Sequence, residues 1–141
     1  MAYLSPSETA LFNQRRSKLR TDYGTGKAQN QFERGQLDLD YDLTKRNLGS
    51  EWGRARTHLP GAYARGGTLN SGVYQRALQD YAAQRGLAFE GAAREYQRGL
   101  GQLGVRSTAQ SNAYTSGLNL IAAEEQARRA QLAASLQGAK W

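Results

Sequence analysis

Residues that could perform catalytic or metal chemistry are sparse in this sequence. The only histidine is His58, which we expect at a helix end, where histidine most often caps carbonyl groups or faces water. No Ser-His-Asp arrangement has support elsewhere in the chain. There is also no cysteine to act as a nucleophile, a metal ligand or half of a disulfide. The residue types therefore argue against a catalytic site.

Two short motifs begin like ligand-binding loops but fail on their spacing. Residues 38–42 (DLDYD) start like a calcium loop, yet the sixth position is Leu43 instead of glycine and the twelfth is Gly49 instead of glutamate. Residues 99–104 (GLGQLG) spell GxGxxG, but a charged helical segment precedes them where a dinucleotide site needs a strand. We interpret these glycines as a bend or a close helix crossing. The prediction is a non-enzymatic protein without metal, cofactor or small-molecule substrate.

The net charge of +7 makes nucleic acid, an anionic surface or an acidic partner worth considering. The charge is spread along the chain, because residues 1–58 carry ten basic against seven acidic side chains and residues 73–141 carry eight against five. The one dense basic group is a solvated helix face or a phosphate contact, and it consists of Arg15, Arg16, Lys18 and Arg20.

The composition favours helices over strands. There are 21 Ala and 17 Leu but only one Ile and two Val, so the β-branched residues that suit a pleated sheet are nearly absent. With 39% apolar residues and a mean hydropathy of −0.74, little is available to fill a compact core. The 16 glycines indicate helices that pack very closely, bend, or become ordered against a partner. No segment approaches the roughly 20 apolar residues of a membrane span, and no secretory signal is evident.

The first arm, residues 1–58, has a clear start signal. Ser5 supplies a cap hydroxyl, Pro6 the first helical position and Glu8 the acidic residue three positions after the cap. Large apolar residues then recur at steps of seven and four, which places them along helical stripes. The phase of the stripes shifts near residues 24–26 and 35, so we expect a long helix with one or two breaks. The stripe residues are Phe12, Leu19, Tyr23; Phe32, Leu39, Leu43; and Tyr41, Leu48, Trp52.

The second arm, residues 73–141, repeats this pattern with stripes that include Tyr81, Phe89, Tyr96 and Tyr114. The predicted fold class is all-α, an extended helical hairpin or kinked long helices that pack in an oligomer. Phe32, Leu43, Trp52, Tyr81, Phe89 and Tyr96 should be buried, several of them between chains. Four pairs at i,i+4 should support exposed helix, and they are Asp42 with Arg46, Glu90 with Arg94, Glu124 with Arg128, and Glu125 with Arg129.

A connector containing Gly and Pro, residues 59–72, should join the arms. Pro60 biases Leu59 away from helix, and Asn70 or Ser71 can cap the following helix. The segment is longer than a plain helix connection needs and carries large side chains. It is a hinge or a bend that also contacts a partner, and the candidate contact residues are Tyr63, Arg65, Gly66, Gly67, Leu69, Asn70, Ser71, Gly72 and Tyr74.

Residues 65–78 (RGGTLNSGVYQRAL), followed by a helix rich in Ala and Gln, resemble an element of small helical virion proteins of tailed bacteriophages. These include tail components and internal or ejected proteins. The resemblance implies a structural role without catalysis, and a location in the virion after synthesis in the host cytoplasm. The 15 Arg against four Lys would suit a phage of a high-GC host such as an actinobacterium.

Two classes of function follow. In the first, the chain is a structural protein present in many copies, which packs against itself and other virion proteins in the tail, the head-to-tail connector or the particle interior. In the second, it is a basic internal virion protein that binds packaged DNA and is ejected with the genome or packed beside it. Salt separates them, because counterion release weakens phosphate binding steeply as salt rises and apolar helix packing does not respond in this way.

Overall fold

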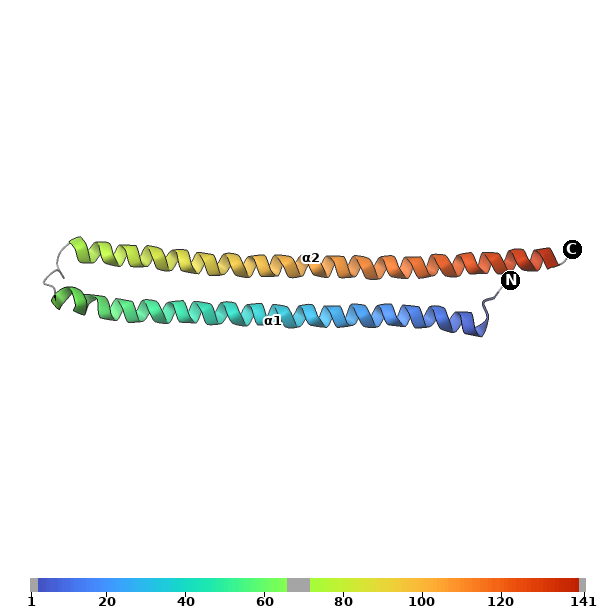
Figure 1. The fold of residues 1–141 in the computed structure, drawn as a ribbon, viewed down its shortest axis with the longest axis horizontal. Helices are drawn as coiled ribbons and strands as arrows, with labels where there is room; N and C mark the ends of the chain where they lie inside the picture. The colour runs from blue at the N-terminus through green and yellow to red at the C-terminus, as the bar shows by residue number, and fades with distance from the viewer. Residues whose placement is uncertain (1–2, 66–71, 140–141) are drawn as a thin grey trace. The chain divides into compact units, whose positions relative to one another are not determined.

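A computed structural model describes residues 3–65 and 72–139, without the side chains of residues 62, 63, 65 and 139. The described residues form two helices, α1 (Pro6–Arg65) and α2 (Gly72–Ala139) (Figure 1). The described residues contain no strand, so the predicted all-α class is confirmed.

The start of α1 follows the predicted capping box. The Glu8 amide donates to the Ser5 hydroxyl at 3.2 Å, and the Ser5 amide donates to the Glu8 carboxylate at 3.1 Å. Pro6 is the first helical residue, where its missing amide hydrogen costs nothing because that donor would be unpaired there anyway. These contacts satisfy amides that would otherwise be left open at the helix start.

The breaks expected near residues 24–26 and 35 do not occur, because α1 runs through them. The shift in phase has another origin. Leu19, Tyr23 and Tyr41 lie at contacts with α2, whereas Leu39 and Leu43 are exposed. The stripes therefore lie on different sides of one helix, and a change of stripe does not mark a change of direction.

The first arm also extends further than residue 58, because α1 continues through Leu59 and Pro60 to Arg65. A proline inside a helix removes one backbone hydrogen bond. The residues on either side stay helical here, so residues 59–65 of the expected connector belong to α1. Within the described residues, α2 begins at Gly72.

The chain divides into two compact units, each containing a segment of both helices. Unit 1 comprises residues 1–32 and 104–141, and unit 2 comprises residues 33–103. In unit 1, contacts run from Glu8 with Arg128 to Tyr23 with Tyr114, so its two segments are antiparallel. In unit 2, contacts run from Tyr41 with Tyr96 to Trp52 with Tyr81, and its segments are likewise antiparallel.

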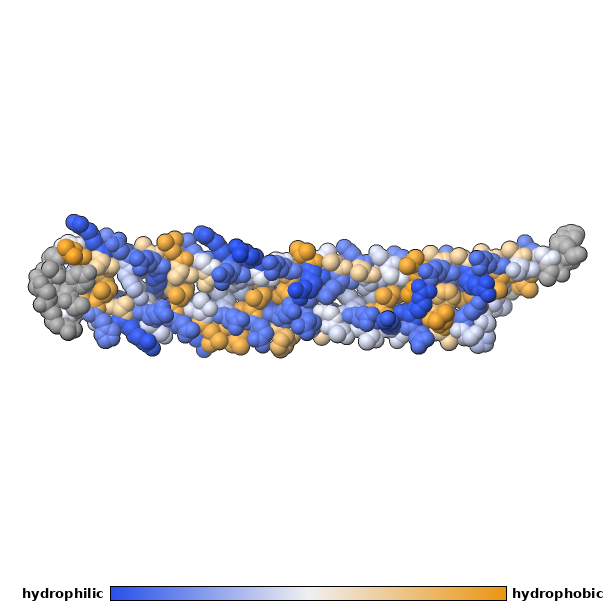
Figure 2. All heavy atoms as spheres, in the orientation of Figure 1, coloured by the Kyte–Doolittle hydropathy of each residue, from blue (hydrophilic) through white to orange (hydrophobic). Residues whose placement is uncertain are grey.

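Little of the apolar surface is fully covered. Among the described residues, only Phe12 and Ile121 are buried hydrophobic side chains, at 8% and 3% exposure. Apolar side chains lie among hydrophilic ones on the surface (Figure 2). Neither helix, over its described residues, has an apolar stretch that could cross a membrane.

Candidate functional site

In unit 1 the helices meet at a pair of stacked tyrosines and a glycine. The rings of Tyr23 and Tyr114 stack with centroids 4.7 Å apart and planes 8° apart. One turn away, Leu19 lies against Gly117, where an added Cβ would approach the leucine Cδ1 to 2.8 Å. A side chain at this position would force the end of the Leu19 side chain to shift, so glycine allows the helices to approach here without that rearrangement. We call these four residues the unit 1 tyrosine site.

Unit 2 contains the same arrangement. Tyr41 and Tyr96 stack with centroids 4.5 Å apart and planes 7° apart. Leu37 lies against Gly99, where an added Cβ would also be 2.8 Å from the leucine Cδ1. We call these four residues the unit 2 tyrosine site. The prediction of a close helix crossing in the GxGxxG segment is confirmed at Gly99, whereas Gly101 and Gly104 face open space.

The two tyrosine sites derive from a sequence repeat that a search for stripes at seven and four misses. The segments LRTDY (19–23) and LDLDY (37–41) share Leu-x-x-Asp-Tyr, and YTSG (114–117) and YQRG (96–99) share Tyr-x-x-Gly. Each pair is offset by eighteen residues, a period of about five α-helical turns. The signal was present in the sequence, but it consists of few residues on two separate segments.

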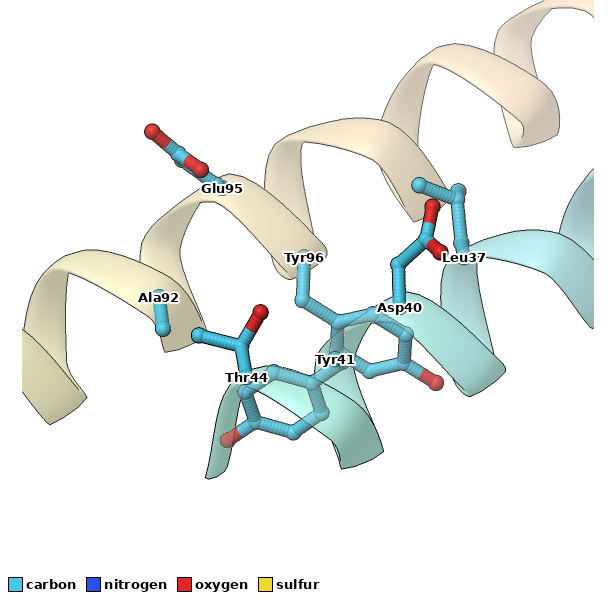
Figure 3. A pocket seen from close by; sticks show the side chains of 7 residues that line it. All are labelled: Leu37, Asp40, Tyr41, Thr44, Ala92, Glu95 and Tyr96. Carbon is cyan, nitrogen blue, oxygen red and sulfur yellow. The ribbon is translucent and has the colours of Figure 1, made fainter. Parts of the chain in front are cut away.

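A small cavity of about 200 Å³ lies beside the stacked rings in unit 2 (Figure 3). A similar cavity of about 190 Å³ lies beside those in unit 1. Three lining residues of α1 in unit 1 recur at the offset in unit 2, which are Leu19, Asp22 and Tyr23 against Leu37, Asp40 and Tyr41. On α2 the tyrosine recurs as Tyr114 and Tyr96, but Gln110 and Ala113 of unit 1 are replaced by Ala92 and Glu95 in unit 2.

Hydrogen bonds and cations hold the aromatic side chains of unit 2 in place. The Tyr96 hydroxyl donates to the Asp38 carboxylate, and this bond raises the pKa of Tyr96 above its ordinary value of 10.0. The Tyr81 hydroxyl donates to the Glu51 carbonyl at 3.2 Å, while the Tyr81 ring stacks on Trp52 with centroids 4.9 Å apart.

The Arg85 guanidinium lies 5.2 Å from the centroid of the Trp52 ring and 4.6 Å from that of Phe89. Its buried Nε has no hydrogen-bond partner among the described residues. The aromatic rings are therefore the neighbours that hold this cation. The arrangement stabilises helix pairing and leaves the stacked faces unavailable to a ligand.

Ion pairs connect the helices of unit 1. Arg15 binds Glu124 and Arg16 binds Glu125, so two of the four candidate phosphate contacts already have carboxylate partners. Lys18 and Arg20 remain exposed.

The predicted pair of Glu124 with Arg128 does not form. The Arg128 Nε binds the Glu8 carboxylate at 2.7 Å, and Glu124 binds Arg15. Glu124 and Arg128 each pair with a residue of α1, because antiparallel packing brings an opposite charge on the other helix as close as the one on the next turn of α2. The hydrogen bond from Arg128 lowers the pKa of Glu8 below its ordinary value of 4.5.

The other predicted helical pairs do form. Asp42 binds Arg46 at 3.0 Å, Glu90 binds Arg94 at 3.6 Å and Glu125 binds Arg129 at 3.0 Å. The interpretation of residues 38–42 as a helical segment is thereby confirmed.

Most of the proposed partner-contact residues lie outside the described part of the chain. Residues 66–71 and the side chains of Tyr63 and Arg65 lie outside the described part of the chain. Gly72 is the exposed first residue of α2, and Tyr74 is half-buried. The contact role of these residues stays a prediction.

The described residues contain no group that could hold a metal ion, and comparisons with known proteins found no match. In the described ranges, no cluster of three or more His, Cys, Asp or Glu side chains could hold a metal ion. Comparison with protein-family models, curated proteins and solved structures found no match.

Proposed function

We propose that this chain is a non-enzymatic structural component of a tailed-phage virion, which assembles in many copies through helix packing in the tail, the connector or the particle interior. The observation that carries the proposal is the exposure of large apolar side chains in a single chain. Each of these residues has an exposed fraction of 45% or more. Examples from both units are Phe32 (62%), Leu39 (51%), Leu43 (45%), Leu87 (67%) and Val105 (72%).

The total surface supports the same proposal. The chain exposes 10574 Å², whereas a compact monomer of 15.5 kDa would expose about 7,200 Å². The excess of about 3,400 Å² compares with about 800 Å² per partner in a stable protein interface. Contacts with several neighbouring chains could therefore cover it, as multiple-copy assembly requires.

The DNA-binding alternative receives less support from the same structure. Arg15 and Arg16 are matched by glutamates, which lowers the positive charge that this cluster offers to phosphate. Lys18 and Arg20 alone are a small remainder of the basic group. The resemblance of residues 65–78 to phage virion proteins supports the virion setting of the structural role.

Sedimentation velocity over a range of concentrations tests the assembly. We expect the parent chain to self-associate, and Leu39→Gln with Leu43→Gln to weaken association about tenfold or more at unchanged helicity, because two exposed leucines lose their apolar contacts. Matched control substitutions at exposed polar positions of the same helix, Gln36→Ala with Asn47→Ala, should have little effect. A parent chain that remains a compact, cooperatively melting monomer would contradict the proposal.

The virion setting has a separate test. Mass spectrometry of purified particles should find the chain in many copies, with the copy number measured by imaging. Binding to duplex DNA that falls steeply between low and moderate salt, with no self-association, would instead favour the internal DNA-binding protein.

A further inference from the structure

The repeated tyrosine sites create a problem of register, because the same contacts recur after eighteen residues. If α1 slipped by this amount along α2, Leu19 would meet Gly99 and Tyr23 would meet Tyr96. Both contacts have the residue types found in the observed pairing, since Gly99 already accommodates a leucine and Tyr96 already stacks on a tyrosine. In that slipped register, Leu37 would face Tyr81 and Tyr41 would face Leu78, so one tyrosine site would be kept and the other lost.

Next to the tyrosine sites, the two units differ in a complementary way. In unit 1, Gly26 leaves room for Gln110, whose Nε2 would be 2.8 Å from a Cβ at position 26. Gln110 also accepts a hydrogen bond of 2.7 Å from the Asn30 amide. The contact thus combines a small residue, a large residue and a polar pair.

In unit 2, the equivalent positions have the larger residue on α1 and the smaller residue on α2. Eighteen residues after Gly26 and Asn30 stand Thr44 and Leu48, and eighteen residues before Gln110 stands Ala92. Thr44 and Ala92 line the same cavity (Figure 3). The larger residue has moved to α1, the smaller one to α2, and the polar pair is replaced by apolar residues.

We infer that these six positions reinforce the register in which α1 pairs with α2, as specificity residues of a duplicated pairing site that act together with the ion pairs of unit 1. In a slipped register, Gly26 would face Ala92, and the two small residues would leave a gap between the helices. The Asn30 side-chain amide would lose its hydrogen-bond acceptor, the side-chain oxygen of Gln110. A half-buried polar residue without its partner is costly, and a single such residue can fix the register of a coiled coil. The inference concerns the pairing of α1 with α2 and does not depend on the proposed virion role.

An exchange of residues along α1 provides the test, because it keeps the composition constant. The half swap exchanges the α1 residues of the two units. Positions 26 and 30 receive the residues of positions 44 and 48, and the reverse, which gives Gly26→Thr, Asn30→Leu, Thr44→Gly and Leu48→Asn. It mismatches both units in the observed register but matches α1 to Ala92 in the slipped one. The full swap adds Gln110→Ala and Ala92→Gln, and restores complementarity in both units.

Register can be measured by disulfide cross-linking, because the natural chain has no cysteine. Leu19→Cys with Gly117→Cys reports the observed register, and Leu19→Cys with Gly99→Cys reports the slipped one. Each reporter pair removes one leucine and one glycine, and Leu19→Cys is common to both. Electrophoresis without reductant separates cross-linked single chains from cross-linked dimers.

We expect the parent and the full swap to form the Leu19–Gly117 cross-link at least about tenfold more than the slipped one, and the half swap to form the observed cross-link less efficiently than either. A half swap that forms neither cross-link while the full swap restores the observed one also supports the inference. A half swap that forms the observed cross-link as efficiently as the parent overturns it. So does a full swap that fails to restore the observed cross-link.

Discussion

A tyrosine pair stacks between the helices in both units. Unit 1 adds ion pairs between its helices, whereas unit 2 adds a second aromatic stack and an arginine that lies over aromatic rings. Arg15, Arg16 and Arg128 each bind a glutamate of the other helix near the buried Phe12 and Ile121. Unit 2 instead has two aromatic stacks between its helices, and its salt bridges Asp42–Arg46 and Glu90–Arg94 stay within one helix. The same antiparallel geometry is thus stabilised by different forces, and the units should respond to different perturbations.

The largest effect should come from truncating Ile121, the more deeply buried of the two buried side chains of unit 1. We expect Ile121→Ala to cost about 2 to 5 kcal/mol of unfolding free energy, because it deletes buried methyl groups and leaves a cavity. Hydrogen exchange should speed up most in residues 1–32 and 104–139. The neighbouring, exposed Leu120 is the control, since Leu120→Ala should cost less than about 0.5 kcal/mol. Equal effects of the two changes would show that burial of Ile121 does not hold unit 1 together.

A smaller effect, in the other unit, should follow Trp52→Ala. The change removes the stack on Tyr81 and one ring beside Arg85, and we expect a loss of about 2 kcal/mol. Hydrogen exchange should accelerate in residues 33–65 and 72–103. Trp52→Phe keeps an aromatic face and should recover most of the stability. If Trp52→Phe is as damaging as Trp52→Ala, aromatic stacking is not the source of stability in unit 2.

The smallest effect should be a response to pH that has opposite directions in the two units. The pKa of Glu8 is lowered in the folded chain because its carboxylate accepts a hydrogen bond from Arg128. Its contribution to unit 1 is therefore present above the ordinary value of 4.5 and is lost as pH falls through the lowered pKa. The pKa of Tyr96 is raised because its hydroxyl donates to Asp38. Its contribution to unit 2 is present below 10.0 and is lost as pH rises through the raised pKa.

Urea titrations followed by hydrogen exchange at acid, neutral and alkaline pH can measure both responses. Glu8→Gln should flatten the acid response of unit 1, and Tyr96→Phe should flatten the alkaline response of unit 2. An acid response that persists in Glu8→Gln would assign the acid sensitivity of unit 1 to another carboxylate.

The all-α fold and the start of α1 follow from local sequence. The cap made by Ser5, Pro6 and Glu8 is a contact among neighbours along the chain, so the residues specify it without knowledge of the fold. The pairs Asp42–Arg46 and Glu125–Arg129 formed as predicted for the same reason. Such features depend on helix geometry alone, which the composition already favours.

Tertiary packing decided the remaining features. Glu124 and Arg128 have the right spacing to pair with each other, yet each binds a residue of α1, because the second helix brings a competing partner equally close. The glycines near residue 24 do not break α1, since contacts with another helix can outweigh the weak helix propensity of single residues. The stacking of Tyr23 on Tyr114 joins positions far apart in the chain. A repeat with a period of eighteen residues could match one tyrosine site in a second pairing of the helices. The three-dimensional contacts, among them the ion pairs of unit 1 and the contact of Gly26 and Asn30 with Gln110, show which pairing the chain adopts.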